Sequence, residues 1–215
     1  MYRRILTIGA LLALSGTLAA PVMASGTIHQ TTSVNWHAQQ ASLGRVGAVD
    51  GAWAQLVRNE NGISFRINTH SLTPGNAYTL WLVVVNNPGE CDPSPCTAPD
   101  IVLNTDTRSQ IRYAAGHLVG GSGLGTFVGS VGEGPLTGWL PERSLDDATA
   151  AEVHLVINDH GPMLAGLMPG MIRTYRGGCS DESPFPPVFP NTALGDGEAG
   201  PNICRLYQSA VFVAP

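Results

Sequence analysis

Apolar and polar residues alternate with a period of two along much of the chain. The alternation is clearest where Ile63, Phe65 and Ile67 alternate with polar residues, and this predicts a β-strand with one buried face. Residues 78–85 are apolar at almost every position, which predicts a central strand covered on both faces. The same criteria predict further strands at residues 34–38, 53–58, 111–119, 152–158 and 209–213.

Turn signals separate these predicted strands. Asn61-Gly62 stands directly before the strand at residues 63–68, and Asn-Gly is a strong hairpin signal. A Gly-rich tract at residues 120–134 is expected to hold a short hairpin or a strand with bulges, and residues 145–151 a short helical turn. About seven to nine short strands joined by turns predict an all-β fold, a single Greek-key β-sandwich with long Gly/Pro-rich loops.

Composition agrees with a folded domain built from short elements. The 215 residues include 26 Gly and 16 Pro, and 43% are hydrophobic, which is too many for a disordered chain. Glycines concentrate at residues 116–138 and prolines at residues 88–99 and 184–201. Because Gly and Pro interrupt helices, this composition argues against a helical bundle and assigns those tracts to loops.

The N-terminal segment has the three-part pattern of a secretory signal peptide. Arg3 and Arg4 precede an uncharged apolar stretch at residues 5–18, and small or medium residues lead up to Ala24. We therefore expect a signal peptide at residues 1–24 and a single β-sandwich domain at residues 25–215. The mature protein is expected in the periplasm or the extracellular medium, without insertion into a membrane.

Four cysteines lie in the predicted mature part, and exported proteins with an even number of cysteines usually form disulfides. Of the three pairings that four cysteines allow, we favour Cys91–Cys96 and Cys179–Cys204, because each pair closes a Pro-rich loop. A zinc-thiolate site is the alternative. Such a site usually has two closely spaced cysteine pairs, and only Cys91 and Cys96 approach that spacing.

The segment at residues 152–162 holds the candidate chemistry. Glu152 and His154 lie two positions apart in a predicted strand and so project from the same face. His160 follows at the end of the strand, and His117 lies in another strand. If the strands pair, the three histidines could bind Zn²⁺ or Cu²⁺, with Glu152 or Asp159 as a further ligand or supporting partner. The alternative is that these histidines are structural residues with hydrogen-bonded rings.

Other functional classes have less support. We find no nucleophile motif and no nucleotide-binding glycine motif. A net charge of −5 without a basic run is unfavourable for binding nucleic acid or anionic lipid. The sequence favours a non-catalytic envelope or extracellular binding module over a metal-binding (Zn or Cu) periplasmic protein or metalloenzyme. The ligand is unidentified, and the disulfide-closed loops, the turn at His160 and an exposed Trp139 are the expected recognition surfaces.

Two stretches resemble known sequences. The first is Tyr78-Thr79-Leu80-Trp81 with Asn86-Asn87-Pro88 and the following cysteines, and the second is Glu152-Val153-His154-Leu155-Val156 with His160-Gly161-Pro162. Together they resemble an uncharacterised family of exported bacterial proteins, which implies a secreted single domain without an established activity. The second stretch is also similar to CHRD domains, a β-sandwich module of extracellular proteins.

Overall fold

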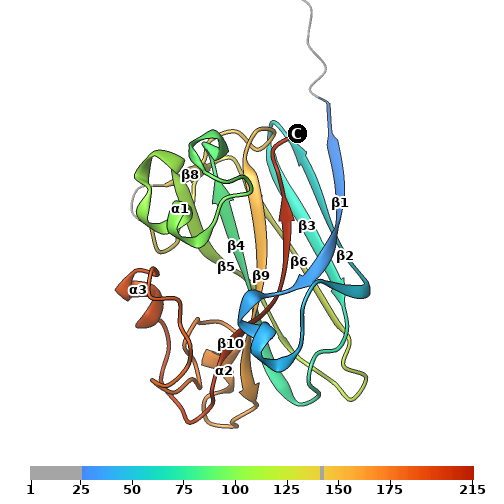
Figure 1. The fold of residues 1–215 in the computed structure, drawn as a ribbon, viewed down its shortest axis with the longest axis vertical. Coiled ribbons are helices and arrows are strands. Elements are labelled where there is room, and N and C mark those ends of the chain that lie inside the picture. Colours follow the sequence, from blue (N-terminus) through green and yellow to red (C-terminus); the bar gives the residue numbers. More distant parts are fainter. Residues whose placement is uncertain (1–25, 141–142) are drawn as a thin grey trace, which may run out of the picture.

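Eight antiparallel strands form one sheet in the computed structural model, which describes residues 26–140 and 143–215 (Figure 1). They are β1 (Ile28–Trp36), β2 (Ala48–Asn59), β3 (Gly62–Thr69), β4 (Asn76–Val85), β5 (Ser109–Leu118), β6 (Gly125–Gly132), β9 (Glu152–Pro162) and β10 (Arg205–Phe212). A separate ribbon pairs β7 (Gly134–Pro135) with β8 (Ser144–Leu145). The all-β prediction is confirmed.

The sheet curls until it nearly closes into a barrel. Its strand order is β5-β4-β9-β10-β1-β2-β3-β6. Strand β4 pairs with β5, and the chain then returns so that β6 pairs with β3, the strand that precedes β4. This return is a Greek-key connection. The two edge strands approach each other, and the His117 ring on β5 lies 5.6 Å from the Phe127 ring on β6. The predicted sandwich therefore takes the form of one continuous sheet whose two halves face each other. Register shifts in the β1–β2, β4–β5 and β9–β10 pairings accompany this curl, since bulges bend a strand and increase its twist.

The main hydrophobic core fills the inside of the curled sheet. Ile63, Phe65 and Ile67 of β3 all point into it, as their alternation predicts. Strand β4 is buried along its whole length. Leu80 and Leu82 belong to this inner core, whereas Trp81 and Val83 belong to a second apolar cluster on the outer face. The predicted burial of both faces of this strand is confirmed.

Short helices lie in the loops that cover the outer face of β4 and β9 or pack against β10. These are η1 (Ala38–Leu43), η2 (Pro88–Glu90), α1 (Ala98–Leu103), η3 (Thr105–Thr107), α2 (Met168–Met171) and α3 (Asn191–Leu194). Figure 1 shows α1 and α3 on the side of the sheet away from β1 and β2. The short helical turn expected at residues 145–151 is a single hydrogen-bonded turn after β8, in which Ala150 and Ala151 donate to the Asp147 carbonyl.

Two disulfides close the covering loops. Cys91 is bonded to Cys96 and Cys179 to Cys204, so the predicted pairing is confirmed. None of the helices in the described ranges has the length and apolar character needed to cross a membrane. The predicted signal peptide at residues 1–24 lies outside the described residues.

Close packing at Gly116 joins the sheet to the covering loops. A Cβ atom at Gly116 in β5 would lie 1.8 Å from the Ile172 carbonyl oxygen. That carbonyl also accepts a hydrogen bond from the Tyr113 hydroxyl on the same strand, at 3.0 Å. Only a residue without a side chain allows this approach.

We therefore expect Gly116→Ala to destabilise the protein by about 2–3 kcal/mol, the usual cost of forcing an extra group into a packed interior. Denaturant unfolding measures the change. Gly121→Ala is the matched control, because a Cβ atom there would have no neighbour within 4 Å. Equal stability of the two variants would contradict this account of the packing.

Candidate functional site

A cleft of about 600 Å³ lies on the outer face of β4, β9 and β10. Val83, Val156 and Val211 from these three strands form its floor. The two disulfide-closed loops contribute its walls, one through Pro95 and Cys96 and the other through the proline-rich segment at residues 184–187. The walls of the cleft are therefore formed by the disulfide-closed loops, which the sequence predicts as ligand-recognition surfaces.

Five aromatic side chains form one packed wall of this cleft. They are Trp81, Trp139, Tyr175, Phe185 and Phe189. The centroids of Trp81 and Trp139 lie 4.2 Å apart, and Tyr175 contacts both phenylalanines at 5.4 and 5.5 Å. Each aromatic pair stabilises such an arrangement by about 0.5–1.5 kcal/mol beyond the area it buries. Trp139 is half-buried in this wall, which places the predicted recognition residue at the cleft.

The proline-rich segment is tied to the sheet by hydrogen bonds. Gln39 donates from its amide nitrogen to the Pro184 carbonyl at 2.6 Å, and its amide oxygen accepts from the Leu206 N–H at 2.8 Å. The Cys204 N–H donates to the Ser183 hydroxyl at 3.0 Å. These bonds hold the segment against β10, so this wall is positioned by more than the disulfide.

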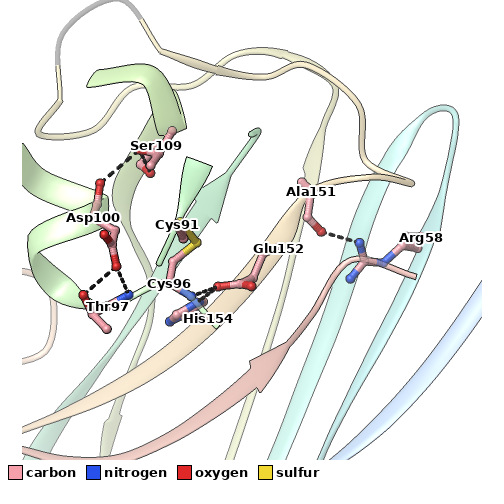
Figure 2. Close-up of polar contacts among 10 residues, drawn as sticks. Arg58, Cys91, Cys96, Thr97, Asp100, Ser109, Ala151, Glu152 and His154 are labelled. Carbon is pink, nitrogen blue, oxygen red and sulfur yellow. Dashed lines mark hydrogen bonds and ion pairs between the residues drawn. A yellow bond between two sulfur atoms is a disulfide. The ribbon is translucent and has the colours of Figure 1, made fainter. Parts of the chain in front are cut away.

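A buried carboxylate and an imidazole lie where the Cys91–Cys96 loop meets the cleft (Figure 2). Glu152 is 1% exposed, and its Oε1 accepts hydrogen bonds from the Cys96 N–H at 2.8 Å and from His154 Nε2 at 2.6 Å. With the proton on Nε2, the other ring nitrogen, Nδ1, carries a lone pair. Nδ1 has no hydrogen-bond partner among the described residues, and His154 lines the cleft.

The remaining polar groups of the lining are uncharged at neutral pH. Burial lowers the pKa of His37 to about 4, and its Nδ1 accepts from the Gln39 N–H. Tyr175 is 1% exposed, burial raises the pKa of its phenol, and its hydroxyl has no hydrogen-bond partner within residues 26–140 and 143–215. No Asp, Glu, Lys or Arg lines the cleft in the described part of the chain.

His160 lies deeper, in a chain of hydrogen bonds that fastens the segment just before Cys179 to β4. Its Nδ1 donates to the Gly177 carbonyl at 2.8 Å, so its Nε2 accepts from the Thr79 hydroxyl at 2.8 Å. The Thr79 oxygen in turn accepts from the Trp81 indole N–H at 2.9 Å. His160 therefore has the structural role that the sequence analysis gave as the alternative to metal binding.

His160, Cys179 and Cys204 also lie together, with candidate ligand atoms within 4.8 Å of one another. The two sulfur atoms are bonded to each other, and both ring nitrogens of His160 are hydrogen-bonded. A metal needs thiolates and a free imidazole nitrogen. With the Cys179–Cys204 disulfide formed, these three residues help to hold the covering loop against the sheet.

The structure brings together only two of the five residues considered for a metal site. Glu152 and His154 share one face of β9, as the period of two predicts. His160 is on the same strand but six residues further on, about 20 Å along an extended chain. His117 pairs with Tyr78 and faces the inside of the barrel. Asp159 also points inward, where it accepts hydrogen bonds from Asn76 and Tyr78.

No local pattern in the sequence indicates the cleft itself. Tyr175, Phe185 and Phe189 lie in segments without strand or helix periodicity, and only their aromatic character marked them. One usable signal was the two-sided apolar strand at residues 78–85, because its outer face needs a cover. The other was the cysteine pair that brackets the proline-rich segment.

Comparisons with known proteins place the chain in no group. No model of a protein family matches it, and neither a curated protein nor a solved structure shows significant similarity to it. The resemblance to CHRD domains and to exported bacterial proteins stays a prediction.

The buried His160 predicts how stability depends on pH. Burial lowers its pKa to about 4, so between its ordinary pKa of 6.5 and about 4 the unfolded chain binds a proton that the folded state does not. This contribution is fully present above pH of about 6.5 and is lost as the pH falls. His37 acts in the same direction, whereas Asp159, whose pKa burial raises, acts in the opposite one.

We expect His160→Gln to make the loss of stability between about pH 7 and pH 4.5 smaller by about 2–3 kcal/mol, since one pKa unit corresponds to about 1.4 kcal/mol. Urea unfolding at a series of pH values measures this difference. His29→Gln is the control, because His29 is exposed. A pH dependence of His160→Gln that parallels the wild-type curve would show that His160 does not titrate as its burial requires.

Proposed function

We propose that the protein is an exported binding module that holds a small, largely apolar molecule in the cleft between its two disulfide-closed loops. The observation that carries the proposal is the cleft itself, about 600 Å³ in volume and lined by aromatic and aliphatic side chains. Sites for small molecules usually measure about 300–1,000 Å³ and combine an apolar lining with a few polar groups.

The way the walls are held supports this function. Two disulfides, the Gln39 bonds and the Thr79–His160–Gly177 chain keep the loops in place. A site that is already formed loses little conformational entropy when a ligand binds, and this raises affinity. The disulfides also favour an oxidising compartment, in agreement with the predicted signal peptide.

A non-catalytic role agrees with the polar groups of the cleft. His154 is oriented by Glu152, yet no hydroxyl or thiol of the described residues is hydrogen-bonded to its Nδ1. Ser209 lines the same cleft and has no hydrogen bond to His154. An activated nucleophile requires such a bond, so the pair is better suited to holding a ligand than to attacking one.

Titration with prodan, an uncharged naphthalene dye whose emission shifts in apolar surroundings, tests the proposal. We expect saturable binding in the micromolar range, with energy transfer from the tryptophans to the dye. Val156→Trp should weaken binding at least about tenfold, because the indole fills the floor of the cleft, where Val156 is half-buried.

Val128→Trp is the matched control, since Val128 is 59% exposed on β6, a strand that contributes nothing to the cleft. Thermal melting of both variants confirms that they fold. Equal prodan affinity in Val156→Trp and wild type, or no binding up to the solubility limit of the dye, would refute the proposed site.

A further inference from the structure

The polar groups of the cleft restrict which end group a ligand can carry. Glu152 accepts a hydrogen bond from His154 Nε2, so in the neutral ring the nitrogen without a partner, Nδ1, offers a lone pair. A complementary ligand therefore brings a hydrogen-bond donor to this end of the cleft.

The charge of the site points in the same direction. Within the described ranges, the only ion-pair partner of Glu152 is His154, and no Lys or Arg lines the cleft. His37, the other histidine of the lining, is neutral at pH 7 because burial lowers its pKa to about 4. Among the described residues, the Glu152 carboxyl group thus has no basic side chain except His154 beside it, at the edge of an apolar cavity where screening by water is weak.

The aromatic wall adds a third preference. Trp81, Trp139 and Tyr175 line the cleft together, and the faces of aromatic rings attract cations. The Tyr175 hydroxyl, which has no protein partner in the described part of the chain, can accept a further hydrogen bond. An acceptor, a negative charge and aromatic faces in one cleft favour a positively charged donor.

We propose that the ligand is an organic amine whose apolar body packs against the aromatic wall and whose ammonium group donates a hydrogen bond to His154 Nδ1, with Glu152 as the counter-charge. This inference rests on the proposed function and names the ligand class for that site. A carboxylate or phosphate end group would face the Nδ1 lone pair and the Glu152 charge, so anionic ligands are excluded. An alcohol can donate the same hydrogen bond but gains nothing from the charge.

Three compounds with the same aromatic body separate these cases. Naphthylethylamine, naphthylethanol and naphthylacetate are titrated calorimetrically at pH 7 and also used to displace prodan. We expect the amine to bind at least about tenfold more tightly than the alcohol, and the acetate most weakly, because an attraction to Glu152 in a poorly screened site corresponds to one or more factors of ten. Acetate binding that equals or exceeds amine binding would overturn the proposal.

Glu152→Gln tests the role of the charge. Glutamine keeps an oxygen that can accept from Cys96 and His154 but removes the carboxylate charge, so the advantage of the amine over the alcohol should fall about tenfold while alcohol binding changes little. Glu60→Gln is the matched control: Glu60 is exposed in the β2–β3 turn, and its substitution changes the net charge equally. An unchanged advantage in Glu152→Gln would refute the counter-charge.

The two proposals fail in distinguishable ways. If prodan binds in the cleft but the three compounds bind alike, the site is a general apolar site and the amine inference is wrong. If neither prodan nor the amine binds, the proposed function is wrong as well. Thermal melting of Glu152→Gln separates a loss of binding from a loss of fold, and its intact affinity for prodan serves as a second check.

Discussion

The burial of β4 on both faces is the constraint on which the rest of the structure depends. Its inner side chains, such as Leu80 and Leu82, are covered by the curled sheet, but Trp81 and Val83 on the outer face need a second cover. Because no second sheet supplies it in the described part of the chain, long loops do so. Loops contain few regular hydrogen bonds, and two disulfides and several buried side chains compensate for this.

Buried polar side chains fasten these loops in a recurring way. Glu152 binds the backbone of the Cys91–Cys96 loop, and His160 binds the backbone at Gly177, two residues before the Cys179–Cys204 loop begins. Arg58 does the same inside the barrel, where its guanidinium donates to the Ala151 carbonyl at 2.5 Å (Figure 2) and burial lowers its pKa. Each is a polar group whose burial is tolerated because it satisfies a backbone group that regular structure does not reach.

The cleft forms where this cover is incomplete. The two loops meet the sheet from different directions, and Val156 and Val211 between them stay only half-buried. The aromatic side chains of the second apolar cluster, on the outer face of the sheet, also form the cleft wall. The same residues therefore stabilise the loops and shape the proposed site. Substitutions at Trp81 or Tyr175 would therefore disturb folding and binding together, whereas Val156 and Glu152 allow the two effects to be separated.

Local patterns in the sequence determined the strands, the two-sided burial of residues 78–85, the disulfide partners and the shared face of Glu152 and His154, because each depends on neighbours in the chain. The tertiary structure alone decided which histidines meet. A period of two indicates which residues share a face within one strand, but not which strands are adjacent or which face lies inside the barrel. His117 and His154 accordingly lie on opposite faces of one sheet. The cleft arises from contacts between residues far apart in the chain, which local alternation does not encode.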